Sequence, residues 1–217
     1  MKWSFFLVLL SFSQSPAQDI WKDVYSESAW ASRDHWQKSQ DLINELGLHR
    51  GGQVADIGCH EGYMTVKLSA VVGHSGKVYA VDTEQKKLDR LKMVLEKRGI
   101  TNVVPIKGQY DNPLLPANSL NAVIILDTYH EMVEHESMLR HIKMALKPGG
   151  WLILCEAIAD SRRASTRQDQ ERKHELGIQY ALEDVKKAGF TIVRQLDPYI
   201  DRTEEKGDKM WLLVVKK

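Results

Sequence analysis

Residues 53–62 read QVADIGCHEG, and this stretch decides the fold class. Its first five residues, Gln53–Ile57, form a short apolar run that predicts a buried strand. The run leads into Gly58, and residues 62–72 then have the pattern of a helix that stops at Gly73. A strand that enters a helix through a glycine-containing turn is typical of the nucleotide-binding unit of open α/β sheets.

The alternation of apolar runs and helix-patterned stretches continues along the chain. Further strands are predicted at residues 77–81, 102–106, 120–126, 151–155, 190–196 and 210–215. Further helices are predicted at residues 34–46, 84–98, 138–146 and 180–188, which gives five strand–helix units followed by two strands. We therefore expect a Rossmann-like α/β fold: a seven-stranded, mostly parallel sheet with the last strand antiparallel and helices on both faces.

Four segments of this pattern allow sharper predictions. Residues 120–126 lack polar alternation, which predicts burial on both faces of the sheet. Residues 147–150, Lys-Pro-Gly-Gly, predict a break before the fifth strand. The very polar residues 161–173 predict a mobile surface crossover or lid. The charged loop 197–209 is short enough for an antiparallel pair, because a parallel crossover needs about a dozen or more residues.

The length of 217 residues suits one such domain and leaves little room for a second. Hydrophobic residues make up 43% and charged residues 27%, as in an ordinary globular protein. The formal net charge of +1 does not favour nucleic acid or an anionic membrane as a partner. A small-molecule ligand is the expected partner, and the oligomeric state is left open.

The first 17 residues predict a secretory signal peptide. Lys2 supplies a positive charge, residues 3–10 are apolar apart from Ser4, and Ser15 and Ala17 occupy the positions of a signal-peptidase site. The apolar run is too short for a transmembrane helix, which needs about 20 residues. We therefore expect cleavage after Ala17 and a periplasmic or secreted protein with no stable membrane insertion.

The remaining chain divides into two predicted parts. Residues 18–52 form a leading helical segment or lid, and residues 53–217 form the nucleotide-binding domain. The only cysteines, Cys59 and Cys155, are not a disulfide framework, so two buried free thiols are expected although a pair is possible.

The predicted ligand site lies at the carboxyl ends of the strands. The glycines after the first strand let backbone amides approach a ligand closely. Asp82 ends the second predicted strand, where an acid can accept hydrogen bonds from both ribose hydroxyls. The alternative reading of Asp82 is an N-cap for the following helix, and the two roles are compatible.

Three stretches carry a resemblance to a known family. VADIGCHEG (residues 54–62), VYAVD (residues 78–82) and LKPGGWLIL (residues 146–154) resemble the signature motifs of class I S-adenosylmethionine-dependent methyltransferases. The nearest group resembles the ubiquinone/menaquinone-biosynthesis methyltransferases, and the resemblance covers about residues 30–217. It implies S-adenosylmethionine as cofactor and methyl transfer to an acceptor that the sequence does not identify.

The resemblance implies a set of cofactor-binding residues. Those expected around the methionine, ribose and adenine parts of the cofactor are Asp56, Gly58, His60, Gly62, Asp82, Thr83, Gln109 and Tyr110. Asp127, with Thr128, Tyr129 and His130, would border the sulfonium and the acceptor. Two positions depart from the family pattern. His60 replaces a glycine, at some strain if its φ is positive, and Gln109 replaces an acid but keeps an oxygen that can accept from the adenine amino group.

Methyl transfer requires alignment of the acceptor, and a general base only if the acceptor must lose a proton in the transition state. His130 is the first candidate for that base, followed by Tyr129 and Glu131; Glu156 and His174 are further possibilities. No metal is predicted. His130 and His135 are five residues apart, and a helical zinc pair needs a spacing of four.

Other readings stay open at this point. Trp21, Tyr25, Trp30 and Trp36 could close over the cofactor or pack the leading helix onto the sheet. A nicotinamide-dependent oxidoreductase would need glycines where His60 and Tyr63 stand. A degenerate nucleoside-binding domain without turnover is the main alternative function, because S-adenosylmethionine is made in the cytosol and this chain is predicted to be exported.

Overall fold

The structure is a computed structural model that describes residues 27–217. The predicted signal peptide and its cleavage site lie outside the described residues, as do Trp21 and Tyr25. In the described part of the chain, no helix is both long enough and apolar enough to cross a membrane.

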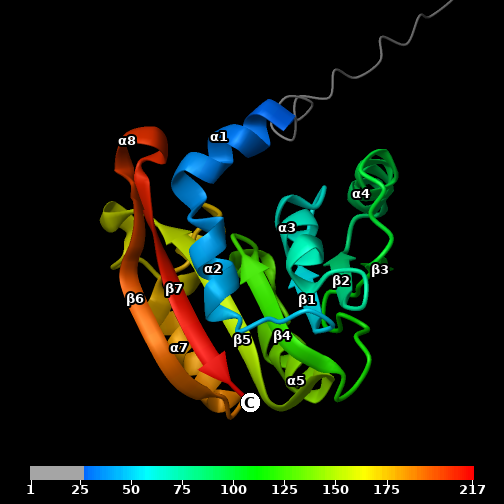
Figure 1. Cartoon of the computed structure of the whole chain (residues 1–217). Helices are drawn as coiled ribbons and strands as arrows, with labels where there is room; N and C mark the ends of the chain where they lie inside the picture. Colours follow the sequence, from blue (N-terminus) through cyan, green and yellow to red (C-terminus); the bar gives the residue numbers. More distant parts are fainter. Residues whose placement is uncertain (1–26) are drawn as a thin grey trace, which may run out of the picture.

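The described residues form a seven-stranded sheet with the order β3-β2-β1-β4-β5-β7-β6 (Figure 1). The strands are β1 (Gln53–Ile57), β2 (Lys77–Asp82), β3 (Val103–Lys107), β4 (Leu120–Leu126), β5 (Leu146–Ile158), β6 (Thr191–Arg202) and β7 (Asp208–Lys216). The first five pair in parallel, and β7 runs antiparallel to both β5 and β6. This topology confirms the predicted fold class.

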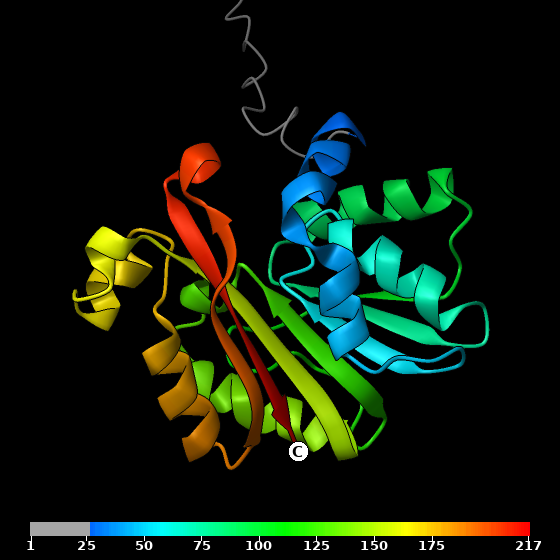
Figure 2. The ribbon, with the colours of Figure 1, turned by 60° about the vertical axis from the view of Figure 1, so that its left-hand side comes forward.

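Helices cover both faces of the sheet (Figures 1 and 2). They are α1 (Glu27–Gln37), α2 (Ser39–Glu45), α3 (Tyr63–Val72), α4 (Gln85–Lys97), α5 (His135–Ala145), α6 (Arg167–Glu171), α7 (Ile178–Lys187) and α8 (Thr203–Lys206), with the 3-10 turns η1 (Tyr129–Glu131) and η2 (Asp160–Arg162). The apolar residues of α2 and α3 pack against one face of β1 and β4, and those of α5 and α7 pack against the other. Because β4 lies between these layers, six of its seven residues are buried, as predicted.

Several predicted elements differ from the structure. The leading helix is two helices, because Lys38 adopts a left-handed conformation (φ 50°) between α1 and α2. Residues 108–119 contain no helix, so the prediction of five strand–helix units is wrong. The predicted break at 147–150 lies inside β5. The register between β4 and β5 shifts there, and such an irregularity accommodates the Pro148-Gly149 pair within a strand.

The polar segment 161–173 was expected to be a mobile lid, but internal hydrogen bonds hold it in a defined conformation. Gln170 is completely buried, and its Nε2 donates to the carbonyl oxygens of Arg162 (2.9 Å) and Ser165 (3.2 Å). Its Oε1 accepts from the backbone N–H of Gly177 at 2.7 Å. A buried amide with several backbone partners can fix a polar segment in place, because it satisfies the backbone polar groups inside the protein.

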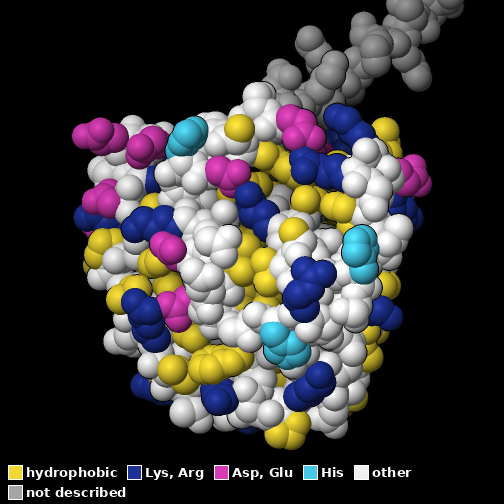
Figure 3. Space-filling model, in the orientation of Figure 1, with side chains coloured by type: hydrophobic (Ala, Val, Ile, Leu, Met, Phe, Trp, Pro, Cys, Tyr) yellow, Lys and Arg dark blue, Asp and Glu magenta, His cyan; other side chains and the backbone are white. Residues whose placement is uncertain are grey.

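The predicted loop 197–209 is mostly strand. β6 continues to Arg202, α8 forms the tip, and β7 begins at Asp208. Alternating charged residues are compatible with an edge strand, where one face is exposed to water. The tip of this hairpin and α1 lie at the same end of the sheet (Figures 1 and 2). On the face shown in Figure 3, acidic and basic side chains are interspersed and neither sign dominates.

Candidate functional site

The turn after β1 packs directly against the turn after β4. Gly58 has φ 75°, and its N–H donates to the carbonyl oxygen of Val81 at 2.9 Å. A Cβ atom on Gly58 would lie 2.3–2.7 Å from side-chain atoms of Thr128. Gly62, with φ 96°, is limited in the same way, because a Cβ atom there would lie 2.4 Å from Leu91 Cδ1. Glycine is therefore required at Gly58 by conformation and by space, and at Gly62 by conformation, because the end of the Leu91 side chain can move.

Asp82 fixes the cofactor-side turn through both carboxylate oxygens. Oδ2 accepts from the backbone N–H of His60 at 3.0 Å, and Oδ1 accepts from the backbone N–H of Glu84 at 2.9 Å. The N-cap of α4 is Glu84, so the alternative reading of Asp82 as that N-cap is wrong. Each carboxylate oxygen has a second lone pair, so both can accept a further hydroxyl.

His60 has a positive φ, 50°, the conformation in which a histidine at this position is strained. Burial lowers the pKa of its imidazole to about 4, and Lys87 adds to the decrease. His60 is therefore neutral at physiological pH, and it adds no charge to the turn.

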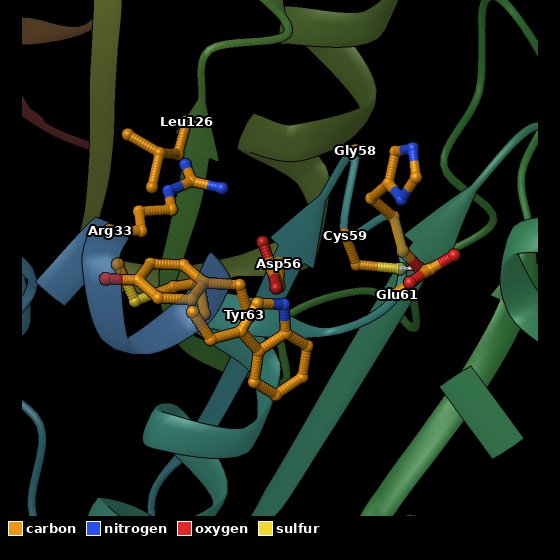
Figure 4. Close-up of a pocket in the computed structure, with 10 residues that line it drawn as sticks. Arg33, Asp56, Gly58, Cys59, Glu61, Tyr63 and Leu126 are labelled. Atoms are coloured by element: carbon orange, nitrogen blue, oxygen red, sulfur yellow. Dashed lines mark hydrogen bonds between the residues drawn. The ribbon is translucent and has the colours of Figure 1, made fainter. Parts of the chain in front are cut away.

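A pocket opens at the carboxyl ends of β1 and β4 (Figure 4). The residues that line it are Trp30, Arg33, Asp56, Gly58, Cys59, His60, Glu61, Tyr63, Met64 and Leu126. Asp56 projects into it and accepts a hydrogen bond from Thr65 Oγ1 at 2.5 Å. Burial raises the pKa of the Asp56 carboxyl to about 6, so a cation placed beside it would favour its ionised form.

Arg33 is a pocket residue that was not predicted from the sequence. Its guanidinium carbon lies 4.3 Å from the centroid of the Tyr63 ring, and its Nε donates to Gln37 at 3.0 Å. Figure 4 shows the guanidinium near Leu126. Burial lowers the pKa of Arg33, while Asp127 opposes this shift. Its position between Trp30 and Trp36 in the leading segment was the available signal, because all three lie within two turns of one helix.

The turn after β4 holds the acceptor-side candidates. Asp127 has φ 57°, a conformation that asparagine and aspartate adopt more readily than most residues. Glu156 is completely buried on β5, and its Oε1 accepts from the backbone N–H groups of Thr128 and Tyr129, both at 2.5 Å. These two amides orient the carboxylate and stabilise its charge.

His130 is bound to this carboxylate, with 2.7 Å between Nδ1 and Glu156 Oε2. Burial opposes the charged form of the imidazole, but Glu156 outweighs it and raises the pKa of His130 to about 9. His130 therefore carries its proton at neutral pH. This state does not favour the predicted role of general base and instead makes His130 a hydrogen-bond donor.

The other two catalytic candidates lie in different surroundings. Tyr129 is completely buried in the core, and its hydroxyl donates to Asp184 at 2.8 Å. Glu131 is exposed, with Oε1 3.8 Å from His130 Nε2 and 3.7 Å from His174 Nδ1. Glu131 thus lies beside His130, whereas the hydroxyl of Tyr129 is used in a buried hydrogen bond to Asp184.

Three predicted adenine-side residues do not line the described pocket. Thr83 follows Asp82 and is half-buried, and Gln109 and Tyr110 are exposed. Their loop nevertheless lies beside the second strand, because the N–H of Gly108 donates to the carbonyl oxygen of Asp82 at 3.1 Å.

Two groups of described side chains have ligand atoms close enough together for a metal ion: His130, Glu131 and His174; and Asp127, His130 and Glu156. His135 belongs to neither group, and its Nε2 lies 3.3 Å from Asp184. Both cysteines are free and buried, as predicted.

Comparison with known proteins agrees with this geometry. Residues 54–150 match a family model described as a methyltransferase domain. A demethylmenaquinone methyltransferase of Geobacillus sp. (strain WCH70) is 26% identical over 124 residues, 57% of this chain and 53% of that protein. The ubiquinone/menaquinone biosynthesis C-methyltransferase UbiE of Cronobacter sakazakii is 32% identical over 115 residues, 52% and 46% of the two chains. This chain thus spans about half the length of these relatives.

Solved structures share the fold over most of the chain. A SAM-dependent methyltransferase from Aquifex aeolicus superposes with a TM-score of 0.72 at 21% identity, covering 88% of this chain and 98% of that one. Phosphoethanolamine N-methyltransferase 2 of Haemonchus contortus, in complex with S-adenosyl-L-methionine, gives a TM-score of 0.68 at 14% identity, over 91% and 58%.

Residues 54–150 are therefore similar to a methyltransferase domain, and the described part of the chain has the fold of SAM-dependent methyltransferases.

Proposed function

We propose that this protein transfers a methyl group from S-adenosylmethionine to a small-molecule acceptor. The observation that carries the proposal is the contact between the turns after β1 and β4, through Gly58 and Thr128. It brings the Asp56–Asp82 side of the site next to Asp127 and His130. A methyl donor and an acceptor held on these two turns would be adjacent, and alignment is the main requirement of the reaction.

The residues present fit an adenosyl sulfonium. Asp82 offers an oriented carboxylate with free lone pairs for a ribose diol. Asp56 is a buried carboxyl in the pocket, next to which a positively charged group is favourable. When bound, the cofactor supplies a methyl group activated by its attachment to a sulfonium.

The protein's own contribution is positional and electrostatic. The acceptor nucleophile forms a bond to the methyl carbon as the carbon–sulfur bond breaks, and that electron pair returns to sulfur. Protonated His130, held by Glu156, can donate a hydrogen bond to the acceptor and orient it. A proton lost by the acceptor would go to solvent or to another group, because His130 already holds one.

Calorimetry tests the cofactor site directly. The purified chain should bind S-adenosylhomocysteine, and Asp82→Ala should weaken that binding about 10- to 100-fold, the usual value of a hydrogen bond to a charged group. Asp89→Ala is the matched control, because Asp89 is an exposed residue of α4 paired with Lys92. An absence of binding by the wild type, or equal affinities for Asp82→Ala and wild type, would overturn the proposed site.

The same site predicts how binding depends on pH. Since a neighbouring cation favours the ionised form of Asp56, whose pKa is about 6, cofactor affinity should fall as the pH decreases below about 6. Titrations at pH 5 and pH 7.5 check this, with Asp56→Asn as the variant that should lose the dependence. Release of S-adenosylhomocysteine with a panel of acceptors then tests turnover.

We also propose that the protein is exported, on the strength of the residues that precede Gln18. Secretion would remove residues 1–17. Sequencing the N-terminus of the protein recovered from each cell fraction tests this: a cytosolic protein that begins at Met1 would contradict it.

A further inference from the structure

Three basic side chains from three separate elements gather around one tryptophan beside the turn after β4. The Trp36 ring centroid lies 4.8 Å from Lys206 Nζ, 5.1 Å from the guanidinium carbon of Arg202 and 5.8 Å from that of Arg33. Arg33 belongs to α1, Arg202 ends β6 and Lys206 belongs to α8. The sequence separates Arg33 from the other two by more than half the chain, so the fold itself assembles this cationic cluster.

Arg202 is the buried member of the cluster, with only 3% of its surface exposed. Its Nε and Nη2 bind Asp208, with 3.2 Å between Nη2 and Oδ2. Its Nη1 lies 3.8 Å from Asp127 Oδ2, which is too long for a hydrogen bond. Among the described residues, Nη1 has no hydrogen-bond partner. A buried donor without a partner costs about 1–3 kcal/mol, so this one indicates a group that binds there.

The charges of the cluster point to the sign of that group. Asp208 pairs with Arg202, Asp127 lies close to all three cations, and Asp56 faces Arg33 from the pocket. Partial burial and then repulsion from Arg202 lower the pKa of Lys206, which shows that the cations destabilise one another. The bound cofactor does not relieve this, because its ammonium and sulfonium outnumber its carboxylate and add a further positive charge.

The position of the cluster separates it from the cofactor pocket. Arg33 lines that pocket, whereas Arg202 and Lys206 do not. They approach Asp127 from the β6–β7 hairpin, and the resemblance implies that Asp127 borders the sulfonium and the acceptor.

We propose that the methyl acceptor carries an anionic group, a carboxylate or a phosphate, and that Arg202 Nη1 and Lys206 bind it beside Asp127. The inference rests on the proposed methyltransferase function and deepens it. It makes Arg202 and Lys206 determinants of acceptor specificity. Arg33 lies between the two ligands and contributes to the same positive field.

The first experiment measures binding without turnover. Thermal stability of the full chain, saturated with S-adenosylhomocysteine, is followed as inorganic phosphate or citrate is added, with sodium chloride at equal ionic strength as the reference. Phosphate or citrate should raise the melting temperature of the wild type above the reference. Lys206→Gln should lose most of this rise, and Lys187→Gln should keep it. Lys187 is an exposed lysine at the end of α7 that pairs with Glu136 and does not belong to the cluster around Trp36.

The second experiment compares acceptors in pairs, each carboxylate or phosphate compound beside its neutral amide or ester. Loss of one hydrogen bond to a charged group should lower kcat/KM of Lys206→Gln for the charged member about 10-fold or more, with a change below about 3-fold for the neutral member. Arg202→Lys keeps a charge at the buried position, and it should show a smaller loss of the same kind if the chain folds.

The outcomes separate this inference from the function on which it rests. If the wild type fails to bind S-adenosylhomocysteine, the proposed function fails. If it binds that ligand but no anion stabilises it beyond the salt reference, or if charged and neutral acceptors lose activity equally, the anionic acceptor is wrong. A drop in cofactor affinity in Lys206→Gln, with anion stabilisation unchanged, would assign the cluster to the cofactor's own carboxylate instead and overturn the proposal.

Discussion

Different kinds of contact hold the candidate site together at the two ends of the sheet. Around β1 and β2, the contacts are glycine turns and backbone amides: Gly58 fits against Thr128, and Asp82 accepts from two backbone N–H groups. Around β5, β6 and β7, they are buried pairs of charged side chains, Glu156 with His130 and Arg202 with Asp208. A glycine turn after a strand leaves a short local motif, whereas no motif marks the pairing of Glu156 with His130, 26 residues away, or of Arg202 with Asp208. This difference explains why the turns after β1 and β2 could be predicted from the sequence and the charged pairs around β5, β6 and β7 could not.

Replacing Gly58 should have the largest effect. Gly58→Ala would combine a positive φ with a Cβ less than 3 Å from Thr128, and we expect a loss of about 2–4 kcal/mol of unfolding free energy together with loss of cofactor binding. Gly207→Ala is the control, because Gly207 has the same φ of 75° and no atom within 4 Å of its Cβ position. Urea denaturation of both variants measures the difference. Equal losses would show that the contact between the two turns contributes nothing.

The charged pair of His130 and Glu156 should make the free energy of unfolding depend on pH. The pKa of His130 is raised from 6.5 to about 9. The stability that protonated His130 contributes is therefore complete below pH 6.5 and is lost as the pH rises through 9. Over that range the unfolding free energy of the wild type should fall by up to about 3 kcal/mol from this residue. His130→Gln should flatten the decrease, and replacing the exposed His74 in the same way should not. The slope against pH is the measurement, since it does not depend on how much the substitution itself destabilises the fold.

A smaller effect is expected at the crossover between β5 and α7. Gln170→Ala removes a buried amide and leaves the N–H of Gly177 without its acceptor, at a cost of about 1–3 kcal/mol. The carbonyl oxygens of Arg162 and Ser165 lose one donor each but keep others. We expect faster amide hydrogen exchange in residues 159–177 with little change in β1 to β4. Unchanged exchange in this segment would restore the expectation of a lid that is mobile in the native protein.

The predictability of the fold follows the same division. The bounds of β1 and β4 were predicted to the residue, because each is a mainly apolar run that ends at a polar or glycine turn. The sequence placed a break at 147–150 and a loop at 197–209, and both are largely strand. Strand pairing overrides the local propensity at both positions. Residues 147–150 belong to β5, which pairs with β4, and β6 extends to Arg202 because it pairs with β7, which follows it in the sequence.

The candidate site divides likewise. The residues expected after β1 and β2 do converge, because their positions follow from strand ends alone. The ion pair that fixes the protonation of His130 requires Glu156 from the next strand of the sheet, which no local pattern reveals. Arg33 and Arg202 belong to no sequence motif, and basic residues are seldom buried without a partner, so nothing in the sequence singles them out. Only the tertiary structure brings them to the same tryptophan.

One further consequence concerns the far border of the sheet. β3 is an outer strand, and Pro105, paired with Ala80 of β2, lies in its middle. Proline has no amide hydrogen, so another polypeptide that paired with the edge strand β3 would miss one hydrogen bond at Pro105. Strand-by-strand growth into oligomers is thereby discouraged along β3.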